Sequence, residues 1–287
     1  MRTIRVFPRR TNASPTDDLA RFGLPDMWDE ADEVRVSVAF DPDIPRAEKF
    51  AKEWEYVTSN VSIGGPAYDD PGGEFIPGMY LKRGYTITSR GCPNKCWFCE
   101  AWKNEGTIRE LTIKPGFNIM DNNILACSKT HIEAVFTMLA EQDKTPLFAG
   151  GLEAARLEAW HVERMISLRT KMLWFAYDTP DDLEPLISAA ELLRDAGLIP
   201  HTHRAGCYVL CGYNSHGRVD SFADAESRLR QAVKLGYFPL AMLYNMGEDW
   251  PDYEQKEWKR FARSWAAPQI VGTKIRELTA NKREAAR

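Results

Sequence analysis

The chain has 287 residues, of which 44% are hydrophobic and 27% charged, the balance of an ordinary globular protein. Its formal net charge of −4 leaves nucleic acid possible as a partner but does not indicate one. No apolar run approaches the roughly 20 residues of a membrane-spanning helix, and the N-terminus lacks the apolar stretch of a secretory signal. We therefore expect a cytoplasmic protein with no membrane partner.

The first 80 residues are rich in Pro and Asp and are predicted to form a small N-terminal α/β appendage. Residues 34–40 and 56–63 have the composition of short strands, and residues 46–55 between them can form an amphipathic helix. A turn-rich stretch covers residues 64–78. We take residues 1–80 as the first domain.

From about Lys82 the pattern changes to strands that alternate with helices. The predicted strands cover residues 84–88, 117–120, 147–149, 172–176, 207–210 and 238–243. The predicted helices cover residues 129–142, 157–168, 181–196 and 222–235. Thr179 and Ser221 offer caps at two helix starts, and Gly197 and Gly236 follow two helix ends.

Strands and helices that alternate at this spacing predict a parallel sheet with right-handed crossovers. We predict an α/β fold in which residues 81–250 form a partial (β/α)6 TIM-like barrel, with a doubly wound open sheet as the alternative. In either arrangement, the chemistry belongs at the carboxyl ends of the strands. Residues 251–287 are predicted to form a helical C-terminal tail that packs its Trp residues on the barrel; contact with nucleic acid or another partner is the alternative.

Three of the six cysteines lie close together, in the stretch Ile87-Thr-Ser-Arg-Gly-Cys92-Pro-Asn-Lys-Cys96-Trp-Phe-Cys99. In a cytosolic chain such clustering favours metal ligands over disulfides. Thiolates suit zinc or an iron–sulfur cluster. A structural zinc site usually has four protein ligands, and no fourth Cys or His stands close by in the sequence. Three thiolates suit a four-iron cluster with one iron left open.

The pattern Cys-x₃-Cys-x₂-Cys, with the aromatic residue Phe98 before the last Cys, resembles the signature of the radical S-adenosylmethionine (SAM) superfamily. The resemblance implies that Cys92, Cys96 and Cys99 hold a [4Fe–4S] cluster whose open iron binds S-adenosyl-L-methionine. It also implies reductive cleavage of SAM to a 5′-deoxyadenosyl radical that abstracts hydrogen from a substrate. A one-electron reductant such as flavodoxin or ferredoxin is then a partner. The substrate, a small molecule or a biopolymer, and the product chemistry are not indicated.

Residues 82–245 resemble the cobalamin-binding and methylthiotransferase-like branch of that superfamily. The matching stretches are Thr88-Ser-Arg-Gly-Cys92-Pro, Asn118-Ile-Met-Asp121-Asn122-Asn123 and Leu147-Phe-Ala-Gly150-Gly151. The accessories of that branch are missing, because the sequence has no Asp-x-His-x-x-Gly motif and its first 80 residues contain no Cys. A cobalamin-assisted radical SAM methyltransferase and a nonenzymatic zinc or electron-transfer module stay as alternatives.

The resemblance also implies contacts to the cofactor at residues near the strand ends. Glycines there allow close approach of the backbone to a ligand, although a tight turn explains Gly150 and Gly151 as well. A surface ion pair is the alternative for Arg156. A helix cap or a turn is the alternative for residues 121–123. The implied set is Phe98, Asp121, Asn122, Asn123, Gly150, Gly151, Arg156, Val209 and Gly212.

Tyr177 and Asp178 end the predicted fourth strand and are candidates for the substrate site. Cys207 and Cys211 lie four residues apart and point to the same side of a strand. With Cys127 they are expected to be buried as small apolar residues; a second cluster is the alternative. Cys211 is also a candidate hydrogen-atom donor to a substrate radical.

Four further side chains have weaker sequence signals. His201 and His203 alternate just before the fifth strand, where they can bind a metal or a phosphate or form a polar rim. Trp97 and Trp102 flank the last cysteine and are expected to shield a cluster from solvent.

Overall fold

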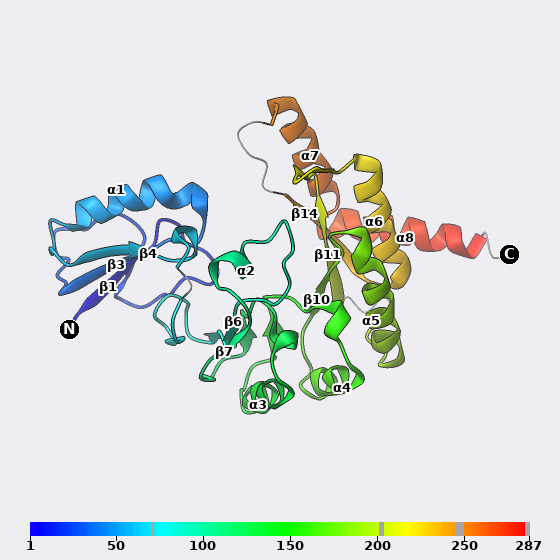
Figure 1. The fold of residues 1–287 in the computed structure, drawn as a ribbon, viewed down its shortest axis with the longest axis horizontal. Helices are drawn as coiled ribbons and strands as arrows, with labels where there is room; N and C mark the ends of the chain where they lie inside the picture. Colours follow the sequence, from blue (N-terminus) through cyan, green and yellow to red (C-terminus); the bar gives the residue numbers. More distant parts are fainter. Residues whose placement is uncertain (71, 201–203, 245–249, 285–287) are drawn as a thin grey trace. The chain divides into compact units, whose positions relative to one another are not determined.

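The structure is a computed structural model that describes residues 1–70, 72–200, 204–244 and 250–284 (Figure 1). The chain divides into two compact units, Met1–Lys144 and Thr145–Arg287. Both units contain helices and parallel strands, so the predicted α/β class is confirmed. The predicted domain boundaries near residues 80 and 250 stay predictions.

The first unit opens with a parallel four-stranded sheet of order β2-β1-β3-β4. Its strands are β1 (Thr3–Val6), β2 (Ala20–Arg21), β3 (Glu33–Ser37) and β4 (Val61–Gly64). A 3₁₀ turn (Asp41–Asp43) leads into α1 (Ile44–Trp54), and a second (Pro66–Tyr68) follows β4. The sequence predicted β3, α1 and β4, but not β1 or β2.

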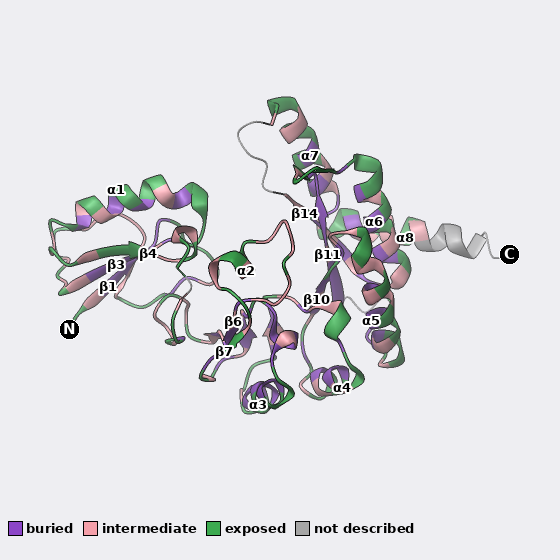
Figure 2. Cartoon of the chain, in the orientation of Figure 1, coloured by how far each residue is buried: buried purple, intermediate pink, exposed green. Residues whose placement is uncertain are grey.

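Helix α1 covers one face of this sheet (Figures 1 and 2). It buries Ala47, Phe50 and Trp54, whose spacing of three and four residues places them on one helical face. In β3, Val34 and Val36 are buried against this face, whereas Glu33 and Arg35 alternate with them and are half-buried. The alternation leaves a polar face on the side of the sheet away from α1.

The remainder of the first unit contains short elements around the cysteine loop. These are β5 (Tyr85–Thr86), β6 (Ser89–Arg90), α2 (Ala101–Asn104), β7 (Arg109–Glu110), β8 (Asn118–Ile119), a 3₁₀ turn (Ile124–Ala126) and α3 (Lys129–Ala140). Strands β5 and β8 pair in parallel, and β6 pairs with β7 in an antiparallel ladder. The cysteine loop therefore starts and ends beside this ladder.

The second unit has a parallel sheet of order β10-β11-β14. Its elements are β9 (Leu147–Phe148), a 3₁₀ turn (Ala154–Arg156), α4 (Ala159–Ser167), β10 (Leu173–Ala176), a 3₁₀ turn (Pro180–Asp182), α5 (Leu183–Asp195), β11 (Ala205–Cys211), β12 (Asn214–Ser215), β13 (Arg218–Val219), α6 (Phe222–Leu235), β14 (Phe238–Leu243), α7 (Asp252–Ser264) and α8 (Pro268–Glu284). Each of the six predicted strands after Lys82 is thus present. Their closure into one partial barrel stays a prediction, because it combines strands of both units.

The predicted C-terminal tail consists of α7 and α8. Trp258 of α7 and Trp265 after it are buried, as expected for a tail that packs its Trp residues on the fold. Trp258 stacks on Phe222 of α6 with ring centroids 4.1 Å apart, and Phe261 packs edge-on against Trp258 at 5.5 Å. Among the residues that the structure describes, we find no helix with the length and apolar character that a membrane crossing requires.

Candidate functional site

The three clustered cysteines lie on the loop between β6 and α2, where all three are half-buried. The backbone N–H of Cys92 donates to the carbonyl of Gly106 at 3.0 Å. The N–H of Cys99 donates to the carbonyl of Cys96 at 3.2 Å, and the indole N–H of Trp102 donates to the same carbonyl at 2.9 Å. Both halves of the loop are therefore held by backbone hydrogen bonds.

Gly91 fixes the start of the cysteine loop. Its φ of +79° lies in the left-handed region, and a Cβ atom there would sit 2.3 Å from the carbonyl oxygen of Thr107 and 2.7 Å from that of Gly106. Its N–H donates to Glu105 Oε2 at 3.0 Å and to Asn122 Oδ1 at 3.2 Å. Only glycine satisfies both the conformation and the close approach.

We expect Gly91→Ala to lower the free energy of unfolding by about 3 kcal/mol, because it adds backbone strain to a clash with two carbonyl oxygens. Urea denaturation of the metal-free protein measures this change. Gly73→Ala is the control, since a Cβ atom there meets nothing within 4 Å. Equal stability of the two variants would contradict the prediction.

Asp121 joins the end of β8 to the segment that leads into the cysteine loop. It is 1% exposed. Its Oδ1 accepts the N–H of Thr88 at 2.6 Å, and its Oδ2 accepts the hydroxyls of Thr88 at 2.6 Å and Ser89 at 2.8 Å. Burial raises the pKa of this carboxyl, and the hydrogen bonds from Thr88 and Ser89 oppose that rise. Asp121 thus braces the loop; its contact with SAM stays a prediction.

Asn122 and Asn123 also reach the cysteine loop, from the segment after β8. Asn122 accepts the N–H of Gly91, and the buried Asn123 donates its Nδ2–H to Cys92 Sγ at 3.5 Å. An amide N–H directed at a cysteine sulfur is a common contact around metal-binding cysteines. Both side chains therefore act on the residues at which the motif begins.

In the described ranges, no group of three or more His, Cys, Asp or Glu side chains is close enough to hold a metal ion. Cys92, Cys96 and Cys99 share one loop without meeting at one point. Their number, type and spacing still fit a three-thiolate cluster, and metal binding commonly organises its own site. Trp97 and Phe98 lie between the second and third cysteines, with their rings edge to face at 5.3 Å.

Tyr177 lies at the end of β10 in the second unit, where it is 3% exposed. Its hydroxyl donates to Gln231 Oε1 of α6 at 2.6 Å, and burial raises its pKa. The carboxylate of the adjacent Asp178 accepts the N–H of Leu210 at 3.0 Å. Burial, assisted by the charge of Asp182, raises the pKa of Asp178 to about 7.

This raised pKa predicts a pH dependence of stability. The folded protein holds a proton on Asp178 that the unfolded chain releases near pH 4. The contribution of Asp178 to the free energy of unfolding therefore falls as pH rises from about 4 to 7. We expect Asp178→Asn to raise the free energy of unfolding by a few kcal/mol at pH 8, where the native carboxyl is charged, and by about 1 kcal/mol or less at pH 4. Urea denaturation at both pH values measures this; an equal effect at both would contradict it.

The end of β11 holds Val209, Cys211 and Gly212. Val209 and Cys211 are fully buried, and the Cys211 thiol donates to the Val209 carbonyl at 3.2 Å. Burial raises the pKa of Cys211 to about 12, so this thiol stays protonated at neutral pH. Gly212 has a φ of +72°, and its N–H donates to Asp220 Oδ2 at 2.8 Å. A protonated thiol is the form that a hydrogen-atom donor requires.

A buried ion pair that was not predicted from the sequence lies at the same strand end. Arg228 of α6 donates from Nη2 to both carboxylate oxygens of Asp220, at 3.1 and 3.0 Å. The same nitrogen donates to the carbonyl of Leu210 at 2.8 Å. Together, Asp220 and Arg228 hold the backbone on both sides of Cys211. No sequence signal marked them, because Arg228 lies on a helix, where charged residues usually face solvent, and Asp220 lies in the short connection before that helix.

The remaining predicted site residues differ in burial and in their contacts. Gly150 is exposed, and Gly151 has a φ of +87° in the turn after β9. Arg156 is exposed and forms an ion pair with Glu153 at 2.7 Å, as its alternative interpretation predicted. Cys127, Cys207 and Cys211 are buried, as expected for small apolar residues. His201 and His203 lie outside the described residues.

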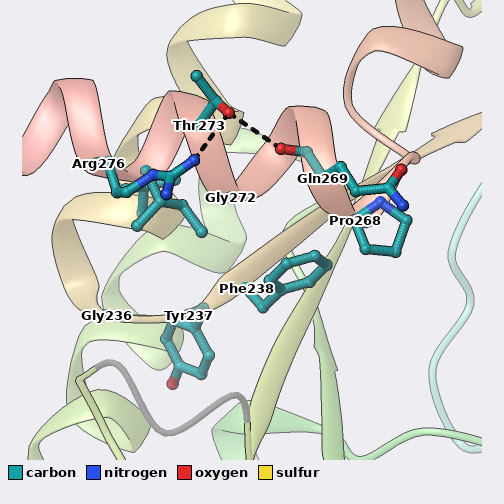
Figure 3. A pocket seen from close by; sticks show the side chains of 10 residues that line it. Gly236, Tyr237, Phe238, Pro268, Gln269, Gly272, Thr273 and Arg276 are labelled. Atoms are coloured by element: carbon teal, nitrogen blue, oxygen red, sulfur yellow. Dashed lines mark hydrogen bonds between the residues drawn. The ribbon is translucent and has the colours of Figure 1, made fainter.

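Each unit contains a cavity. A pocket of about 530 Å³ in the second unit lies between the end of α6, β14 and α8, where the Thr273 hydroxyl accepts from Arg276 and donates to the carbonyl of Gln269 (Figure 3). None of the predicted site residues lines this pocket. A larger cavity of about 780 Å³ in the first unit is lined by Asn122 and by residues flanking the cysteine loop. The first-unit cavity is therefore the one beside the predicted chemistry.

No protein-family profile matches the sequence, and no curated protein matches it. Coproporphyrinogen III oxidase (HemN) from Escherichia coli, a radical SAM enzyme by its description, aligns with 76% of this chain at 12% sequence identity and a TM-score of 0.40. The chain covers 56% of that protein, a little over half its length.

Proposed function

We propose that this protein is a radical SAM enzyme in which Cys92, Cys96 and Cys99 hold a [4Fe–4S] cluster. The observation that carries the proposal is the cysteine loop: three half-buried thiols, spaced as in that superfamily, on a loop that follows β6. Its first cysteine receives the Nδ2–H of Asn123, and its start is fixed through Gly91 and Asp121. When bound, the cluster and SAM supply homolytic cleavage of a carbon–sulfur bond and thus a hydrogen-abstracting radical.

The protein's own residues have three tasks in this proposal. The thiolates bind the cluster, while Asp121 and Asn122 hold the loop in position from the segment after β8. Trp97 and Trp102 limit the access of solvent, which protects a reactive cluster. Phe98, the glycines after the strands and Val209 are proposed as contacts to SAM. Tyr177, Asp178 and Cys211 are proposed to act on the substrate, with electrons coming from a flavodoxin or a ferredoxin.

The proposal is tested by anaerobic reconstitution with iron and sulfide, reduction with dithionite, and mass spectrometry of 5′-deoxyadenosine after incubation with SAM. We expect four irons per chain and formation of the nucleoside. Cys96→Ser should lose both, because two thiolates do not retain the cluster. Cys127→Ser, a buried cysteine outside the motif, is the matched control and should keep both.

Other outcomes assign other functions. Zinc in place of iron would make the cysteine loop a structural metal site. A cluster that forms without production of 5′-deoxyadenosine would indicate electron transfer. A bound corrinoid that accompanies SAM cleavage would indicate a cobalamin-assisted methyltransferase. The first two outcomes contradict the proposal, and the third refines it.

A further inference from the structure

The cavity of about 780 Å³ in the first unit has the polar face of the N-terminal sheet as its floor. Because α1 covers the other face, Glu33, Arg35 and Ser37 of β3 and Ser62 of β4 line the cavity. A sheet face of this kind normally meets solvent. Here it borders a half-open cavity, with Ser62, Asp70 and Glu74 exposed at its edge, and the size of this cavity matches pockets for small organic ligands.

The segment of residues 72–81 supplies the apolar side of the cavity. Its lining side chains include Phe75, Ile76, Met79 and Tyr80. The segment is held at both ends. The buried Arg5 of β1 donates to the carbonyls of Gly78 at 2.6 Å and Met79 at 3.2 Å, and Arg109 and Arg90 donate to the carbonyls of Gly72 and Gly73 at 2.9 and 3.3 Å. The segment is thus fixed by the protein itself.

The third wall of the cavity adjoins the cysteine loop. Arg90, Glu105 and Asn122 line it, and the last two accept the N–H of Gly91, the residue before Cys92. Ile87 and Met120, which follow β5 and β8, complete this wall. The cavity therefore reaches the carboxyl ends of two parallel strands, where ligands of α/β proteins commonly bind.

The charges of the lining do not balance. Arg9 pairs with Asp43 at 2.9 Å, Arg35 with Glu33 at 2.9 Å, and Arg90 with Glu105 at 3.3 Å. Two further carboxylates, those of Asp70 and Glu74, line the cavity without a basic partner among the residues described. Each accepts one backbone N–H, from Gly72 and Thr112 respectively. An excess of carboxylates favours a cationic ligand.

We propose that this cavity is the substrate site and that it takes a small molecule with a protonated amine and an apolar body. Asp70 and Glu74 bind the amine, and the Phe75–Tyr80 side of the cavity packs on the apolar body. The assignment of the cavity as a substrate site rests on the proposed function, because the cavity adjoins the loop that would hold the cluster. The binding itself requires only the folded chain.

Titration calorimetry on the full-length, metal-free protein tests this site with tryptamine as the probe and indole-3-propionate and tryptophol as its anionic and neutral counterparts. We expect tryptamine to bind at least about tenfold more tightly than either counterpart. The double variant Asp70→Asn/Glu74→Gln keeps both backbone hydrogen bonds and should lose about tenfold in affinity. Ser62→Trp should abolish binding by filling the cavity. Glu48→Gln, an exposed carboxylate on α1, is the matched control and should bind as the native chain does.

Equal affinity for the three probes, absence of tryptamine binding, or indifference to the cavity variants would overturn the assignment. Circular dichroism and urea denaturation show whether each variant is folded. The 5′-deoxyadenosine assay separates the two proposals. If the nucleoside forms but the amine does not bind, only the proposed substrate class is contradicted. If the amine binds but no nucleoside forms, the proposed binding site stands and the radical SAM function is contradicted.

Discussion

Replacing Arg228 with Met is expected to lower the free energy of unfolding by about 3–5 kcal/mol. The side chains of Arg228 and Asp220 are 7% and 0% exposed, so the variant leaves the Asp220 carboxylate buried without its counter-charge. It also removes the hydrogen bond that Arg228 donates to the carbonyl of Leu210. Denaturation by urea at pH 7 measures the change.

Two variants show whether this loss comes from the buried charge. Arg230→Met, on the same helix, removes an exposed arginine that pairs with Glu226 and should cost less than about 1 kcal/mol. Arg228→Met combined with Asp220→Asn should recover a large part of the stability, because the amide oxygen of Asn still accepts the N–H of Gly212. A double variant as unstable as Arg228→Met would show that lost packing, not charge, dominates.

The second large effect is expected at Asp121. Asp121→Ala should cost about 3 kcal/mol, because the buried N–H of Thr88 and two hydroxyl groups lose their acceptor. Asp121→Asn should stay within about 1 kcal/mol of the native chain, because its amide oxygen accepts the N–H and the hydroxyls of Thr88 and Ser89 can rotate to accept from its NH₂.

Urea denaturation of the metal-free protein gives the stabilities, and iron content after reconstitution reports the effect on the cysteine loop. We expect Asp121→Ala to bind less than half the iron of Asp121→Asn when both are folded. Equal stability of the two variants would mean that the three hydrogen bonds contribute little. Equal iron content would mean that the cysteine loop does not depend on this brace.

Helix α6 shows where local sequence signals were sufficient. Its predicted range, residues 222–235, equals the observed one. Ser221 accepts the N–H of Asp224 as the N-cap, and Gly236 ends the helix with a φ of +107°. Both signals are local and act on the backbone directly, so no tertiary contact overrides them.

Strands β1 and β2 show where such signals failed. The sequence of β1, Thr-Ile-Arg-Val, contains Arg5, which is buried because it binds the carbonyls of Gly78 and Met79 more than seventy residues away. Strand β2 has only two residues, Ala20 and Arg21. A buried arginine with distant partners and a two-residue strand leave no periodic pattern.

In the candidate site, too, local features were predicted from the sequence and contacts between distant residues were not. The spacing of the three cysteines is a local property and was visible in the sequence. The hydrogen bonds of Asp121 to Thr88 and Ser89, and the pairing of Asp220 with Arg228, depend on which strand ends meet. The sequence placed Asp121 near the site but could not show that its carboxylate is occupied by protein groups.

The contacts that hold the base of the cysteine loop come entirely from the polypeptide. The Gly91 amide donates to Glu105 and Asn122, and the Asp121 carboxylate accepts hydrogen bonds from Thr88 and Ser89. Small zinc domains, by contrast, gain their folding free energy from the ion. In this protein the metal-free chain should be native, with slow hydrogen exchange at the Gly91 amide. We therefore predict that the proposed cluster would bind to a chain that is already folded, and that its removal would leave the chain folded.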